Sequence, residues 1–193
     1  RKVGTHLELL DCLTCDKCIP VCPNDANFAF DVPTGRWQPG RLRWDGPTWT
    51  LSEGAPLIAD KRHQIGNTPD ACNLCGQCDP WCPEDGGPYL VKPNLFLSAE
   101  SFEAHPGRDG FVLSKDRASL TWRRGGQRLT YTALPDGRAR LSLATGALVL
   151  EGDRPVASEG EGELELWRAT TLRLFLAAFN TPGIRAWLPT LSV

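Results

Sequence analysis

The sequence contains no methionine, not even at its first position, although it has 193 residues. The absence predicts a processed chain or a fragment of a longer protein, from which a signal or an N-terminal catalytic region could be missing. No apolar run is long enough to span a bilayer, so we expect no membrane span. The first residues also lack the pattern of a secretory signal.

An excess of either charge is also missing, because 21 Lys and Arg residues face 23 Asp and Glu residues, for a net charge of −2. Without a basic excess we expect no nucleic-acid partner. The chain lacks a Gly-x-Gly-x-x-Gly loop that opens a helix, a Walker-type loop and a Gly-x-Ser-x-Gly elbow. We therefore predict no catalytic residue, and whether the chain is part of an enzyme stays open.

Cysteine is plentiful but confined to two short runs that share one spacing. The first run holds Cys12, Cys15, Cys18 and Cys22, and the second holds Cys72, Cys75, Cys78 and Cys82. Each run is followed by proline and has the C-x2-C-x2-C-x3-C-P spacing of bacterial two-cluster ferredoxins. A tight loop can point three sulfurs at one cluster, whereas a fourth sulfur from the same loop would be crowded.

The spacing therefore predicts two [4Fe-4S] clusters with crossed ligation, in which the fourth cysteine of each run binds the other cluster. The ligands of cluster I are predicted to be Cys12, Cys15, Cys18 and Cys82. The ligands of cluster II are predicted to be Cys72, Cys75, Cys78 and Cys22. Crossed ligation would join the two runs and hold the clusters close enough to exchange electrons, so the expected function is electron transfer.

Zinc and disulfides are the alternatives for these cysteines. Structural zinc usually pairs two C-x2-C knuckles and does not need a third step followed by C-x3-C-P. Cysteines this close in sequence make poor disulfide partners, and the chain does not resemble a small stapled scaffold. Reduced thiolates fit a reducing compartment, so we expect a cytoplasmic protein.

Acidic residues crowd the two runs, and in sequence only Lys17 opposes them. They are Asp11, Asp16, Asp70, Asp79, Glu84 and Asp85. Nearby negative charge lowers the reduction potential of a cluster, so we expect low potentials. Trp81 lies between two predicted ligands and is expected to shield a cluster from water.

The expected fold class is α+β, with two domains. Residues 1–97 are predicted to form a two-[4Fe-4S] ferredoxin-like domain with a hairpin insertion, because residues 41–44 and 48–51 flank an Asp-Gly-Pro turn signal. Residues 98–193 are predicted to form a β-rich accessory domain with a C-terminal helix. Short strands and turn signals between residues 111 and 150 predict an antiparallel meander.

The end of the accessory domain is expected to contain a linker and then a helix. Residues 155–162 are polar and contain glycine, which predicts the linker. The helix is predicted over residues 163–179, because Leu172, Phe175, Leu176 and Phe179 recur at helical spacing. A buried core helix is the favoured interpretation, and a helix that docks on a partner subunit is the alternative.

A closer likeness extends beyond the cysteines. It runs through Cys12-Leu-Thr-Cys15-Asp-Lys-Cys18, Val21-Cys-Pro-Asn-Asp-Ala-Asn27, Ala71-Cys-Asn-Leu-Cys75-Gly-Gln-Cys78, Tyr89 and Leu95-Phe96. These segments resemble the C-terminal region of the selenate reductase iron–sulfur/flavin subunit family, and the likeness covers roughly residues 7 to 112. Those long bacterial proteins are similar to the small subunit of NADPH-dependent glutamate synthase and to part of dihydropyrimidine dehydrogenase.

The resemblance implies ferredoxin-type clusters in this region and redox partner chains that carry flavin or molybdenum. In the family, FAD and a nicotinamide nucleotide bind an N-terminal part that has no counterpart here. Two interpretations stay open. The chain is an electron-transfer module or subunit of a larger flavin- or molybdenum-dependent oxidoreductase, or it is a free-standing ferredoxin-type carrier with an accessory β-domain.

Overall fold

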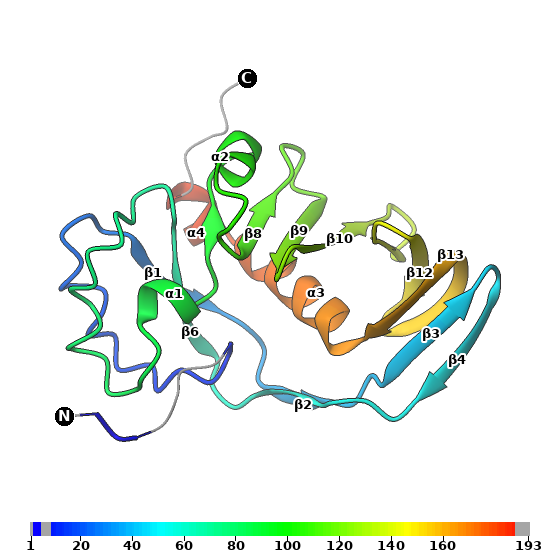
Figure 1. Ribbon diagram of the computed structural model, residues 1–193, viewed down its shortest axis with the longest axis horizontal. Coiled ribbons are helices and arrows are strands. Elements are labelled where there is room, and N and C mark those ends of the chain that lie inside the picture. Colours follow the sequence, from blue (N-terminus) through cyan, green and yellow to red (C-terminus); the bar gives the residue numbers. More distant parts are fainter. Residues whose placement is uncertain (1, 5–8, 188–193) are drawn as a thin grey trace.

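The dominant feature of the computed structural model is a nine-stranded sheet that curves around helix α3 (Figure 1). The structure describes residues 2–4 and 9–187, with only the backbone of residues 185–187. In spatial order the strands are β4 (Thr48–Ser52), β3 (Arg41–Asp45), β13 (Arg154–Glu165), β12 (Gly146–Glu151), β11 (Ala139–Ser142), β10 (Gln127–Ala133), β9 (Ser119–Arg124), β8 (Gly110–Leu113) and β7 (Leu95–Phe96). All neighbouring strands are antiparallel except β7 and β8, which are parallel.

Two small antiparallel sheets and four helices complete the described chain. The small sheets pair β1 (Asn27–Asp31) with β6 (His63–Asn67) and β2 (Gly35–Trp37) with β5 (Leu57–Ala59). The helices are α1 (Pro88–Val91), α2 (Ala99–Ala104), α3 (Trp167–Phe179) and α4 (Pro182–Trp187). None of these helices is long and apolar enough to cross a lipid bilayer.

The predicted α+β fold class, with a ferredoxin-like domain, is wrong. The chain is mostly β, its largest sheet has nine strands, and its described helices are small. The prediction failed because cysteine spacing specifies the conformation of ligand loops and carries no information about the strands between and after them. The predicted hairpin is present as β3 and β4, but it extends the large sheet by pairing with β13.

The predicted linker is also wrong, because residues 155–162 lie within the long strand β13. Most of its side chains are exposed, so no apolar alternation marks the strand, which is instead defined by pairing with β12 and β3. Gly162 lies opposite Trp44, whose ring would clash with any Cβ there. Residues 163–165 complete this strand, so helix α3 starts at Trp167 and not at Glu163. The antiparallel meander between residues 111 and 150 is confirmed.

Helix α3 packs between the large sheet and β1. The Phe175 ring lies 5.4 Å from that of Phe30 on β1 and 5.1 Å from that of Phe111 on β8, measured between centroids. One turn later, the Phe179 ring lies 5.2 Å from Phe30. Aromatic pairs at such distances add to the free energy of area burial. The helix thereby fixes the strand that follows the first cysteine loop against the sheet.

We predict that Phe175→Ala lowers the free energy of unfolding by about 3–5 kcal/mol, because it opens a cavity in a core that cannot readily collapse. The side chain is 0% exposed. Urea denaturation followed by tryptophan fluorescence measures the change. Leu51→Ala is the control, since Leu51 is 54% exposed on the edge strand β4 and its loss should cost less than about 1 kcal/mol. Equal losses in the two variants would contradict this role for α3.

Candidate functional site

The two cysteine loops have the same backbone conformation. In each loop the second residue after the first cysteine has a positive φ, 53° at Thr14 and 59° at Leu74. The residue after the second cysteine also has a positive φ, 58° at Asp16 and 73° at Gly76. Left-handed residues turn the chain sharply, which lets a short loop curl around one point. The repeated spacing in the sequence therefore corresponds to a repeated local structure.

Each loop borders a small cavity, and the structure brings four cysteines to each one. The first cavity is lined by Cys12, Cys15, Cys18 and Cys82. The second is lined by Cys22, Cys72, Cys75 and Cys78. The fourth cysteine of each run therefore lies at the cavity of the other run, which is the grouping that the crossed assignment predicts. We call these the Cys12 cavity and the Cys22 cavity.

All eight cysteines are free, so the structure contains no disulfide among them. Within residues 2–4 and 9–187, no three Cys, His, Asp or Glu side chains converge closely enough to hold one metal ion.

Hydrogen-bond donors point at the sulfurs. The backbone N–H of Thr14 donates to Cys12 Sγ at 3.2 Å, and that of Ala26 donates to Cys22 Sγ at 3.3 Å. Burial raises the pKa of the Cys18 thiol to about 12 and also raises the pKa of the Cys78 and Cys82 thiols. Thiolates at these three positions therefore need compensating positive charge or hydrogen bonds.

Lys92 is a residue of this site that the sequence did not reveal. It follows α1, is 3% exposed, and donates from Nζ to Cys12 Sγ at 2.8 Å. Lys61 Nζ also reaches this loop and donates to the backbone oxygen of Cys12 at 3.1 Å. No signal near the cysteines in sequence marks either lysine, because only the fold brings them there. The expectation that Lys17 alone opposes the acidic residues is therefore wrong.

The lining of the Cys22 cavity has no cation and several amides. Among them, Asn27 Nδ2 donates to the Cys18 backbone oxygen at 2.8 Å, and Asn67 Nδ2 donates to Asn27 Oδ1 at 3.0 Å. Arg108 Nη2 then donates to Asn67 Oδ1 at 3.1 Å. This buried relay connects the first cysteine loop, both strands of the β1–β6 pair and the segment before β8.

Exposed apolar side chains surround the outer cysteines. Cys15 and Cys75 are exposed. Leu13 and Leu74, one in each loop, are exposed as well. Trp81, which we expected to shield a cluster from water, is 58% exposed. The outer parts of the two loops are thus accessible, and they expose apolar side chains next to charged ones such as Asp16 and Lys17.

The comparisons with known proteins find two curated relatives. Both are named "Putative oxidoreductase YgfK", one from Escherichia coli strain K12 and one from Escherichia coli O157:H7. Each is 31% identical over 112 residues, which cover 58% of this chain but only 8% of the relative's length. No protein-family model and no solved structure matches the chain. The similarity is to proteins named as oxidoreductases, and the more specific resemblance to selenate reductase subunits stays a prediction.

We predict that Asn67→Ala lowers the free energy of unfolding by about 1–3 kcal/mol, because it leaves the buried amide of Asn27 without its donor. Asn67 is 1% exposed and bridges Asn27 and Arg108. Chemical denaturation gives the value. Asn24→Ala is the matched control, since Asn24 is exposed and follows the first cysteine run. A variant as stable as this control would show that the relay does not stabilise the fold.

Proposed function

We propose that the chain binds two [4Fe-4S] clusters and transfers electrons through them. The observation that carries the proposal is the division of all eight cysteines into two sets of four around separate cavities. Cys12, Cys15, Cys18 and Cys82 would hold one cluster, and Cys72, Cys75, Cys78 and Cys22 would hold the other. A bound cluster of this type supplies reversible one-electron transfer.

The cysteine spacing favours a cluster over zinc, because structural zinc usually pairs two C-x2-C knuckles. A tetrahedral zinc ion requires four ligand atoms about 2.3 Å from one point. A cluster presents a separate iron to each cysteine, so its ligands stand apart. No set of described residues converges on a single ion, whereas two sets of four cysteines surround cavities.

The surrounding residues fit the requirements of such a cofactor. Lys92 and the backbone N–H of Thr14 donate to Cys12 Sγ, which stabilises negative charge on that sulfur. Pro23 and Pro83 follow the fourth cysteines and fix the direction in which the chain leaves each run. Leu13, Leu74 and Trp81, each next to a cysteine or one residue from it, are exposed and would be available to contact a redox partner.

We further propose that this chain works as the electron-transfer part of a larger oxidoreductase, with a flavin- or molybdenum-containing partner. The support is the similarity to proteins named as oxidoreductases that are far longer than this chain. The accessible face beside Cys15 and Cys75 would be where electrons enter or leave, because electron transfer needs a short path to the partner.

Paired substitutions test which cysteines share a cluster. If ligation is crossed, Cys22→Ala with Cys75→Ala removes two ligands of one cluster and leaves the other intact. Cys22→Ala with Cys15→Ala damages both. After anaerobic reconstitution we expect about four iron and four sulfide per chain in the first variant and far less in the second. The reverse ranking would show ligation within each run, and zinc without sulfide in the unaltered chain would overturn the cluster proposal.

We predict that Lys92→Met lowers the reduction potential of the cluster at the Cys12 cavity by on the order of 100 mV. A buried cation stabilises the more negative reduced state, and its charge is poorly screened. Potentiometric titration in the Cys75→Ala background, which should keep only this cluster, isolates the effect. Lys17→Met removes an equal charge from an exposed position and should shift the potential much less. Equal shifts would show that the Lys92 contact has no special effect.

A further inference from the structure

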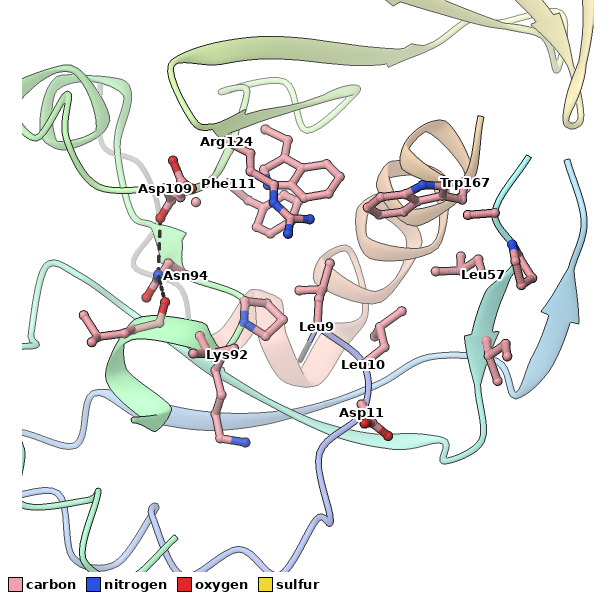
Figure 2. A pocket seen from close by; sticks show the side chains of 18 of the residues that line it. Leu9, Leu10, Asp11, Leu57, Lys92, Asn94, Asp109, Phe111, Arg124 and Trp167 are labelled. Atoms are coloured by element: carbon pink, nitrogen blue, oxygen red, sulfur yellow. Dashed lines mark hydrogen bonds between the residues drawn. The ribbon is translucent and has the colours of Figure 1, made fainter. Parts of the chain in front are cut away.

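A large cavity of the described chain lies beside the Cys12 cavity and is not used by the proposed electron transfer. It has a volume of about 750 Å³, within the range of roughly 300–1,000 Å³ typical of small-molecule sites. Its walls come from the segment before Cys12, β5, the α1–β7 segment, β8, β9 and the start of α3 (Figure 2). The lining includes Leu57, Val91 and Trp167, so it is partly apolar.

Arg124 lines this cavity, and Arg168 lines an adjoining pocket that also includes Arg124 and Trp167. The Arg124 guanidinium from β9 points into the open space in Figure 2. Its central carbon lies 5.8 Å from the centroid of the Trp122 ring, and that of Arg168 lies 5.1 Å from the same centroid. No described residue forms an ion pair with either arginine. The Nε of Arg168 is buried without a hydrogen-bond partner among the described residues.

The two guanidinium groups are held close enough to affect each other. Burial and then the positive charge of Arg124 lower the pKa of Arg168. Arg168 Nη1 donates to Gln127 Oε1 at 3.2 Å, a neutral acceptor, and the negative charge of Asp109 acts in the opposite direction and raises the pKa of Arg168. A bound anion would relieve both the repulsion and the missing hydrogen bonds.

Helix α3 begins at the same place and adds to the positive potential. Its N-cap residue, Leu166, provides no side-chain hydrogen bond, and its first turn contains no acidic residue. The first N–H groups of a helix have no partner within the helix and favour a negative charge. Trp167 and Arg168 are the first residues of this helix, so its positive end faces the region of the two arginines.

The carboxylates near this cavity either accept hydrogen bonds from other groups or lie away from Arg124. Glu165 accepts from the Ala55 backbone N–H at 3.1 Å and pairs with Arg41 at 3.6 Å. Asp109 Oδ1 accepts from the Gly125 backbone N–H at 2.9 Å. In Figure 2 the Asp11 carboxylate lies at the opposite end of the cavity from Arg124. None of these carboxylates forms an ion pair with Arg124 or Arg168, and only Asp109 partly offsets the charge of Arg168.

We infer that this cavity binds a small organic phosphate with an aromatic ring. Its phosphate would contact Arg124, Arg168 and the first N–H groups of α3, because guanidinium forks and helix N-termini both match phosphate oxygens. Its ring would lie against the half-buried Trp167 and the apolar lining. The ligand site is distinct from the two cysteine cavities, and its existence does not depend on the proposed clusters.

Binding is measured by calorimetry and by quenching of tryptophan fluorescence, with the cluster-loaded chain under anaerobic conditions. The probes are AMP and flavin mononucleotide, each compared with its phosphate-free nucleoside, adenosine or riboflavin. We expect saturable binding of at least one phosphate and at least about tenfold weaker binding of the matching nucleoside, because the charge-assisted hydrogen bonds are lost. Preference between AMP and flavin mononucleotide identifies the ring.

Arg124→Gln and Arg168→Gln should each weaken binding of the phosphate by about tenfold or more. Arg154→Gln is the control, because Arg154 is exposed on β13 and does not line the cavity. Arg124 is exposed, so its substitution tests the site even if Arg168→Gln impairs folding. The inference is overturned if neither phosphate binds, if the nucleosides bind equally well, or if Arg124→Gln binds like Arg154→Gln.

Discussion

The packing of helix α3 against two separate sheets is the constraint on which the rest of the structure depends. Phe175 and Phe179 contact β1, which follows the first cysteine loop, and Phe175 also contacts β8 of the large sheet. This shared core and the relay through Asn67 and Arg108 hold the cysteine loops against the sheet. The same helix begins at the large cavity, so its position also determines where the two arginines and the apolar lining meet.

The parts that could be predicted from sequence are those specified by residues close together in the chain. The cysteine spacing predicts that the first three sulfurs of each run share a cavity, because loop closure is local, and the crossed place of the fourth sulfur follows from the two-cluster pattern. The meander from residue 111 to 150 follows from alternation and turns. The strand β13 could not be predicted, since its exposed and polar sequence becomes a strand only by pairing with β12 and β3. Lys92 and Arg108 were missed because they reach the site from segments that only the tertiary fold brings there.

The two cysteine cavities differ in their polar lining although their loops are alike. The Cys12 cavity has the ammonium of Lys92 against a sulfur and is also lined by the buried Glu84, whereas the Cys22 cavity is surrounded by the amides of Asn24, Asn27, Asn67 and Asn73. A full charge shifts the potential of a cluster more than neutral dipoles do at similar distance. Under the proposed function, the potential at the Cys12 cavity would therefore depend on the opposing effects of Lys92 and Glu84, and the potential at the Cys22 cavity on amide dipoles.

Lys92 also lies between the Cys12 cavity and the large cavity and lines both. Its stem lines the large cavity, while its ammonium contacts Cys12 on the other side. A ligand bound at the start of α3 would thus displace water from the cavity wall that contains Lys92. Removing water from that wall strengthens the effect of the Lys92 charge on Cys12. Occupancy of the cavity and the potential at the Cys12 site would then be linked, and by thermodynamic reciprocity a change of charge at that site would alter the affinity for the ligand.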